Sequence, residues 1–281
     1  EVTLKQAFPE INAVSVFGGE ELSPPKFGKV FIAIDIKNID GLPDSKIEEY
    51  SNYINRRSPF SVMPVFIEPE FLYLAVSSNV RYNINVTTNS INRIKALVTD
   101  AINTYNFAQL NDFNVIFRNS LFSNIIDEAD SSIISNISSV VVYKKINPVL
   151  NKSGNFVLDF GIALQNNIPL QQSIYPIDDI RTVYSSTFTY QGEICTIEDN
   201  GDGILRIVKT QEKNKISITN IGTVDYTTGL IKIVDFRVSA YEGSVIKIFT
   251  TPSDKDIKAT KNNIMLIEPA DVSVTVESLR E

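Results

Sequence analysis

The chain has 281 residues, and its 26 Lys and Arg against 33 Asp and Glu give a net charge of −7. An acidic chain with scattered basic residues repels phosphate backbones, so we expect no nucleic-acid partner. The chain contains no His, which excludes the Ser-His-Asp and Cys-His catalytic groups and the usual zinc sites.

The apolar runs are too short for insertion into a membrane. None approaches the roughly 20 residues of a transmembrane helix. The first residues, EVTLK, have neither the basic nor the apolar region of a signal peptide, and they lack an initiator Met. We therefore expect a fragment of a longer protein whose N-terminal part is missing.

Residues 1–28 are predicted to be a leader of one strand and a loop. Residues 11–17 alternate loosely between apolar and polar side chains, as a strand does. The sequence GGEE at 18–21 and the prolines Pro24 and Pro25 then favour a loop.

Residues 29–147 are predicted to mix strands and helices in one α+β domain. Strands are expected at 30–36, 62–67, 71–86 and 140–143. Between them, one helix is expected from an N-cap at Ser45 to about Arg57, a second after an N-cap at Ser90, and a third at 122–129. The order predicts a split βαβ sheet with its helices on one face.

The strand at 71–86 is unusually long. Seven apolar residues alternate with polar ones through this stretch, and an unbroken strand would extend about 50 Å at roughly 3.3 Å per residue. It is either continuous or two strands joined near Ser77 and Ser78. This strand is one candidate for an edge exposed to a partner.

Residues 148–281 are predicted to form a β-rich domain resembling a sandwich or a barrel. Short alternating runs recur every eight to twelve residues, with turn sequences between them. The polar stretch 147–155, which contains Pro148 and Gly154, is expected to be a flexible joint between the two domains.

Several sequences imitate functional motifs without their chemistry. The run DNGDG at 199–203 lacks the acids of a calcium loop, so a hairpin turn is expected. Ser23 and Lys26 have the spacing of a Ser–Lys catalytic pair, but Pro24 and Pro25 prevent the helix that the pair needs. Adjacent acidic pairs do not define a glycosidase cleft. Cys195 is expected to be a small buried apolar residue. We therefore predict no catalytic, cofactor-binding or metal-binding residues, and no enzymatic activity.

Two stretches resemble a known family. The sequences PPKFGKVFIAI at 24–34, GLPD at 41–44 and RSPF at 57–60 are similar to the baseplate J-like proteins of contractile phage tails. The sequence IGTVDYTTGLI at 221–231 resembles a strand-turn-strand of large phage structural proteins. Phe27 departs from the family, which often has Pro beside the Gly. Together the stretches resemble the C-terminal part of the baseplate wedge protein of large contractile-tailed phages.

This resemblance implies a structural subunit of the virion. It would be assembled in the host cytoplasm, pair with itself as a homo-oligomer, a dimer, and join other baseplate wedge subunits. The resulting ring would change shape when the tail contracts. The resemblance implies no cofactor and no small-molecule substrate. A receptor-binding or adhesin module of a tail fibre is the alternative, which the β-rich second half suggests.

Overall fold

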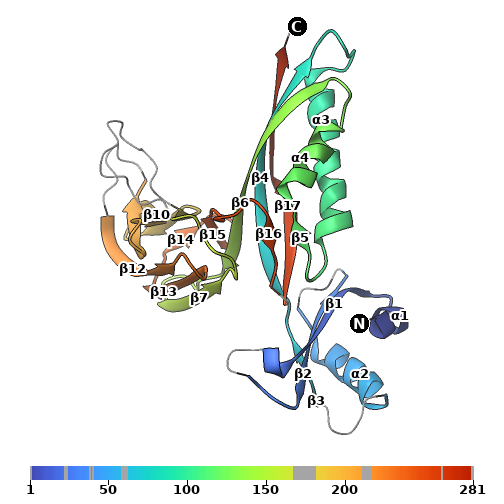
Figure 1. The fold of residues 1–281 in the computed structure, drawn as a ribbon. Coiled ribbons are helices and arrows are strands. Elements are labelled where there is room, and N and C mark those ends of the chain that lie inside the picture. The colour runs from blue at the N-terminus through green and yellow to red at the C-terminus, as the bar shows by residue number, and fades with distance from the viewer. Residues whose placement is uncertain are drawn as a thin grey trace. The chain divides into compact units, whose positions relative to one another are not determined.

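A computed structural model describes residues 2–21, 25–37, 39, 41–57, 63–166, 182–210, 217–260 and 262–279. The chain divides into two compact units. The first comprises Glu1–Phe71, Tyr105–Phe117 and Lys258–Leu266. The second comprises Leu72–Thr104, Arg118–Ile257 and Ile267–Glu281. Figure 1 labels the helices and strands of both units.

The first unit is built on a three-stranded sheet. Its strands are β1 (Ile11–Gly18), β2 (Lys29–Ile36) and β3 (Met63–Ile67), in the order β1-β2-β3. The first pair is antiparallel and the second is parallel. A parallel pair needs a crossover connection, which α2 (Asp44–Asn55) supplies. The short elements α1 (Val2–Ala7) and η1 (Gly19–Glu21) flank β1.

The core of this unit lies where β1 and β2 meet α1 and α2. The buried side chains that pack together are Leu4, Ile11, Val14, Ile32, Ile34, Ile36, Leu42 and Tyr50. Tyr50 is fully buried, and its ring meets that of Phe8 edge-on at a centroid distance of 4.7 Å. The predicted N-cap at Ser45 is wrong: the helix starts at Asp44, and Pro43, two residues earlier than predicted and without a capping side chain, takes the N-cap position. The Pro43 carbonyl oxygen accepts hydrogen bonds from Lys46 N at 2.9 Å and Ile47 N at 3.0 Å.

Later parts of the chain complete the first unit. They include η2 (Asn106–Leu110), a single π-helical turn, and β5 (Ile116–Phe117), which pairs with β16 (Ile257–Lys258). Phe113 and Ile264 form an isolated antiparallel bridge and pack with Ala13 and Ala33. This second cluster fixes segments distant in sequence against β1 and β2.

The second unit begins with three long strands. These are β4 (Glu70–Asn83), β6 (Ile133–Ile146) and β17 (Asn263–Leu279), in the order β17-β4-β6. Strand β4 is continuous, which decides between the two interpretations of residues 71–86. Figure 1 shows α3 (Ile91–Tyr105) and α4 (Asn119–Asp127) on one side of these strands. Ser90 caps α3 as predicted, since its Oγ accepts a hydrogen bond from Arg93 N at 3.3 Å.

The buried faces of these elements explain the packing. Alternate side chains of β4 are buried, as are residues three and four apart on α3. The buried side chains are Leu72, Leu74, Val76, Val80 and Tyr82 on β4, Ile94, Val98 and Ile102 on α3, and Phe122 and Ile126 on α4. The prediction that β4 offers a free edge is wrong, because β17 and β6 bind both of its edges. Strand β17 ends this ladder instead.

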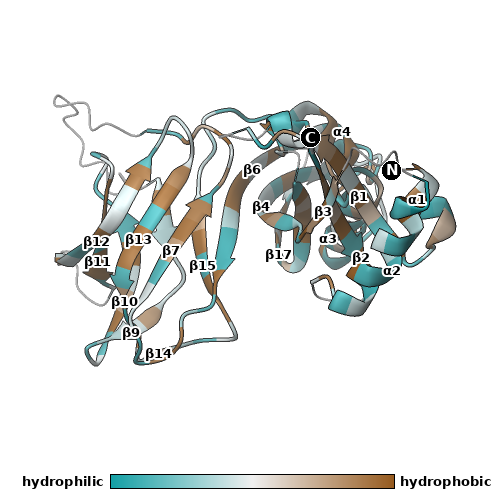
Figure 2. Cartoon of the chain, turned by 90° about the horizontal axis from the view of Figure 1, so that it is seen from below, coloured by the Kyte–Doolittle hydropathy of each residue, from teal (hydrophilic) through white to brown (hydrophobic). Residues whose placement is uncertain are grey.

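The same ladder continues from β6 into shorter strands. Its path is β15 (Ile246–Thr250), β8 (Val183–Ser185), β10 (Glu193–Asp199), β11 (Ile204–Lys209), β12 (Ser217–Asp225), β13 (Leu230–Phe236) and β7 (Gly154–Asp159). Off this path, β9 (Phe188–Tyr190) pairs with both β10 and β14 (Ala240–Tyr241). Figure 2 shows both hydrophobic and hydrophilic residues along β7 and β13, and the buried hydrophobic ones are Leu158 on β7 and Ile231, Ile233 and Phe236 on β13.

The architecture is thus mixed α+β with extensive sheets, as predicted, but the finer layout differs. The predicted single split βαβ sheet is not confirmed, because β2 and β3 lie in one sheet while β4 and β6 lie in another. Among the described residues, the short strands form an open ladder and not a closed barrel. One isolated bridge, between Leu164 and Pro252, links the chain beyond β7 to the chain beyond β15.

Candidate functional site

A polar network joins three strands of the second unit that are far apart in sequence. The hydroxyl of Tyr143 on β6 donates to Glu268 Oε2 at 2.8 Å and also to the Asp271 carboxylate, both on β17. Lys145 Nζ donates to Glu268 Oε1 at 2.5 Å, and Lys247 Nζ on β15 donates to Asp271 Oδ1 at 2.7 Å. Two carboxylates of β17 therefore hold side chains from both β6 and β15.

Aromatic rings form the floor of this network. Strand register places Tyr143 opposite Tyr73 on one side and Phe249 on the other, with ring centroids 5.0 and 5.1 Å away. Lys145 Nζ lies 3.9 Å from the Tyr73 ring centroid, and Lys247 Nζ lies 4.6 Å from that of Tyr143. Each ammonium group thus contacts a ring face and a carboxylate together.

The pKa values of the network favour permanent charge. Burial raises the pKa of Glu268, but its hydrogen bonds with Lys145 and Tyr143 outweigh burial and lower that pKa below 4.5. Burial lowers the pKa of Lys145, but the hydrogen bond to Glu268 and the electrostatic attraction of Tyr73 and Glu268 together outweigh burial and raise the pKa. Burial and both carboxylates raise the pKa of Tyr143 far above its ordinary value. Glu268 and Lys145 stay ionised near neutral pH, so the network acts as a brace and not as an acid–base pair.

The DNGDG sequence forms the predicted hairpin, which connects β10 to β11. Asp199 is buried, and its Oδ1 accepts hydrogen bonds from Thr182 N and Val183 N at 2.8 and 2.9 Å. Its Oδ2 accepts one from Tyr226 OH at 2.6 Å. Asn200 Oδ1 accepts two more bonds, from Asp202 N and Ile204 N. The Asn200 amide therefore holds the turn, and the Asp199 carboxylate joins it to the start of β8 and to Tyr226.

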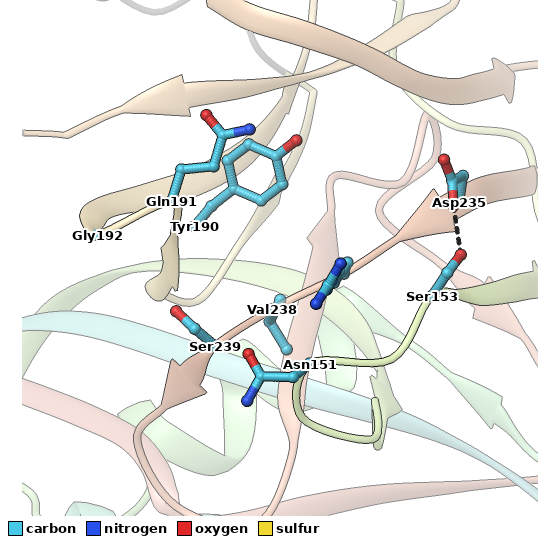
Figure 3. Close-up of a pocket in the computed structure, with 9 residues that line it drawn as sticks. Asn151, Ser153, Tyr190, Gln191, Gly192, Asp235, Val238 and Ser239 are labelled. Carbon is cyan, nitrogen blue, oxygen red and sulfur yellow. Dashed lines mark hydrogen bonds between the residues drawn. The ribbon is translucent and has the colours of Figure 1, made fainter.

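A polar pocket of about 480 Å³ lies in the second unit, among three turns. Figure 3 shows the side chains that line it. They are Asn151 and Ser153 before β7, Tyr190 at the end of β9 with Gln191 and Gly192 of the turn that follows it, and Asp235 near the end of β13 with Arg237, Val238 and Ser239 between β13 and β14. The dashed line in Figure 3 joins the Ser153 hydroxyl, which donates, to the Asp235 carboxylate. The groups that line this pocket donate and accept hydrogen bonds, as the groups of a binding site do.

The other residues that the sequence analysis considered as candidates for catalysis or metal binding can also be located. Cys195 is buried, and burial raises the pKa of its thiol, so a reactive thiolate is disfavoured. Ser23, Pro24 and the acidic pair at 178–179 lie outside the described residues. Within the described ranges, no group of three or more Cys, Asp and Glu is placed to hold a metal ion. No helix in the part of the chain that the structure describes has the length and apolarity to cross a membrane.

Sequence reasoning missed both the network and the pocket. The network joins residues of β6, β15 and β17 that no local motif connects. One sequence feature could have indicated the pocket. Two-residue hairpin turns usually have Asn or Asp before Gly, and this turn has Gln191 before Gly192.

Comparison with known proteins adds the family. A model of the baseplate structural protein gp6, C-terminal domain I, matches residues 1–67, and a model of its C-terminal domain III matches residues 70–145. The matches together cover half of the chain. The chain belongs to the gp6 family of structural baseplate wedge proteins.

One relative in this family is the baseplate wedge protein gp6 of Enterobacteria phage T4. It is 25% identical over 121 residues, which make up 43% of this chain and only 18% of that protein. The family places the chain in the tail baseplate of a virion, as a structural subunit of the wedge. The predicted likeness to the C-terminal part of a wedge protein is thereby confirmed, whereas the likeness to baseplate J-like proteins stays a prediction.

Proposed function

We propose that this chain is a joining part of the baseplate wedge, which pairs with itself as a dimer and links neighbouring wedge subunits into a ring. The ring would change shape when the tail contracts. The family match is the observation that carries this proposal. The charged network supports it, because a load-carrying subunit needs strands held together by more than local contacts.

Strand β17 offers the surface for pairing. It ends the long ladder, and among the described residues the part from Val272 to Leu279 has a strand partner on one edge only, β4. The five residues 272–276, VSVTV, contain neither charge nor Pro, the two features that usually protect an edge strand. Ser273 and Thr275 are exposed. A second copy of this strand could add to the sheet by backbone hydrogen bonds.

The test introduces a charge at this edge. We expect Thr275→Lys to weaken self-association, because a Lys on an edge strand opposes pairing by another strand. The matched control is Asn92→Lys, which adds the same charge at an exposed position on α3. Sedimentation velocity over a micromolar concentration range would measure the dimer fraction of the unmodified chain and of both variants.

Two results would contradict the proposal. The unmodified chain would sediment as a monomer throughout the range, or Asn92→Lys would reduce the dimer fraction as much as Thr275→Lys. The first result would show that this chain does not associate with itself. The second would show that β17 is not the surface through which it associates.

We also propose that the chain has no enzymatic activity, binds no cofactor and is assembled into the virion in the host cytoplasm. The structural role of its relative and the lack of His support the first point. Hydrolysis of polysaccharide or peptidoglycan by the purified chain would contradict it.

A further inference from the structure

The pocket among the three turns of the second unit has a role that the wedge function does not explain. We propose that it binds a neutral carbohydrate, with one sugar ring seated between Tyr190, Gln191 and Arg237. Its volume, about 480 Å³, lies within the range of roughly 300–1,000 Å³ that is usual for small-ligand sites.

The backbone at the pocket is held in an unusual conformation. Four non-Gly residues of the described chain have positive φ, and three of them line this pocket: Asn151 at 60°, Gln191 at 52° and Asp235 at 54°. Asn and Asp tolerate the left-handed region through local hydrogen bonds of their short side chains. Such residues cluster where a side chain has to be aimed, because the conformation costs free energy.

Gln191 departs from the rule for its turn. It and Gly192 both have positive φ, between the paired residues Tyr190 and Glu193, which is the geometry of a type I′ hairpin turn. Asn-Gly or Asp-Gly suits this turn best, and Gln is the same amide with a longer reach. A local rule broken at a pocket indicates that the side chain has a function there. Figure 3 shows the Gln191 and Tyr190 side chains at the pocket.

Hydrogen bonds between the turns fix the walls. Asn151 N donates to Val238 O at 2.7 Å, and Asp235 N donates to Asn155 Oδ1 at 2.9 Å. Ser239 N donates to Thr189 O at 3.0 Å, next to the Gln191 turn. Each turn is therefore bonded to another, so the pocket is preformed and a ligand need not order it.

The polar groups match a sugar better than other ligands. Within the described chain, the side chains of Asn151, Tyr190, Gln191 and Arg237 make no hydrogen bond, so they are available to a ligand. Arg237 only donates, the Asp235 carboxylate accepts, and the amides and the Tyr hydroxyl do both. Neighbouring sugar hydroxyls also donate and accept.

Charge and apolar surface exclude the alternatives. Arg237 and Asp235 balance each other, so an anionic ligand would gain one attraction and meet one repulsion. An apolar ligand would cover the amides without replacing their hydrogen bonds to water, which is unfavourable. The Tyr190 ring and Val238 offer apolar surface to the C–H groups of a sugar ring.

Saturation-transfer NMR on the full 281-residue chain tests the proposal, with glucose, galactose and N-acetylglucosamine as probes at millimolar concentration. We expect transfer to at least one of these sugars. Gln191→Asn should weaken that binding about tenfold, as the loss of one good hydrogen bond does. The same change should preserve or raise resistance to urea, because Asn suits the turn better. Lys232→Ala, an exposed change on β13 outside the pocket, is the control and should change nothing.

Absence of transfer from all three sugars would overturn the proposal. Transfer that Gln191→Asn and Tyr190→Phe leave unchanged would overturn it too, because the sugar would then sit elsewhere. If the pocket variants instead weaken association with another baseplate protein and no sugar binds, the pocket is a protein contact. That result overturns carbohydrate binding and leaves the wedge function intact, whereas failure of self-pairing leaves carbohydrate binding intact.

Discussion

At the scale of single residues, the network around Tyr143 shows how charge is tolerated inside a sheet. Removing a carboxylate or an ammonium group from water costs several kcal/mol, which one partner rarely offsets. Here Glu268 contacts Tyr143 and Lys145, and Asp271 contacts Tyr143 and Lys247. Several charge-assisted hydrogen bonds share the desolvation cost, so the loss of one partner should be felt by the others.

We predict that Tyr143→Phe destabilises the chain by about 1.5–3 kcal/mol, the usual contribution of a hydrogen bond to a charged group. The ring stays in place, and both carboxylates lose a donor. Tyr82→Phe is the control, because Tyr82 is buried on β4 and its hydroxyl makes no hydrogen bond within the described chain. Urea unfolding of both variants would measure the difference. Equal effects of the two changes would show that the network contributes nothing.

The lowered pKa of Glu268 predicts the direction of a pH effect. A carboxyl group whose pKa is lower in the folded state stabilises it fully above the ordinary value of 4.5 and loses this contribution as pH falls through the lowered value. The stability difference between the unmodified chain and Glu268→Gln should therefore be largest at neutral pH and shrink in acid. Urea unfolding at a series of pH values would show it, and a difference that grows in acid would refute the assignment.

At the scale of elements, the family-like sequence at 221–231 has a packing reason for its Gly residues. A Cβ on Gly222 of β12 would lie against the backbone carbonyl oxygen of Lys232 on β13, far inside contact distance. A Cβ on Gly229, where φ is 75°, would meet the carbonyl oxygen of Ile162. Neither backbone can move aside as a side chain can, so both positions require Gly.

We predict that Gly222→Ala destabilises the chain by about 1–3 kcal/mol, as overpacking usually does. Gly154→Ala on β7 is the control, because its nearest neighbour is the Phe156 ring at 3.1 Å, which is able to shift. Thermal unfolding of the two variants would compare them. A loss at Gly154 as large as that at Gly222 would show that strand spacing in the ladder is not the limiting factor.

At the scale of the whole molecule, the division into residues 1–28, 29–147 and 148–281 stays a prediction. Residues 147–155 hydrogen-bond to β14 and to the chain before it, through Asn147 with Tyr241 and through Asn151 with Val238. Three Lys residues lie in or beside this segment. Lys144 is buried and Lys145 forms an ion pair with Glu268, whereas Lys152 is exposed.

If this segment is the joint between two domains, limited trypsin digestion should cut first after Lys152 and release fragments of about half the mass. Exposed, locally opening segments are cut before packed ones. Mass spectrometry of the earliest products would identify the site. First cuts elsewhere, with this segment intact, would show that it is packed and that no hinge lies there.

The sequence by itself determined the class of fold, the identity of most elements and the family. Period-two alternation marked β4 and the short strands, a 3.6-residue stripe marked α3, and Ser90 marked its start, because these signals lie within one element. The lack of His was enough to remove whole classes of chemistry. The alternation, the stripe and the cap can each be read from residues that are close together in the chain, and the lack of His can be read from the composition.

Only the tertiary structure decided which strand borders which. Alternation shows that β4 is half-buried, but it does not show that β17, almost 200 residues later, covers the edge that the sequence left open. The same holds for Tyr143, whose partners Glu268 and Asp271 follow more than 120 residues on. A strand's own pattern specifies its buried face, whereas its hydrogen-bonding edges are backbone and carry no residue code. The choice of partner is therefore settled by packing of the whole chain.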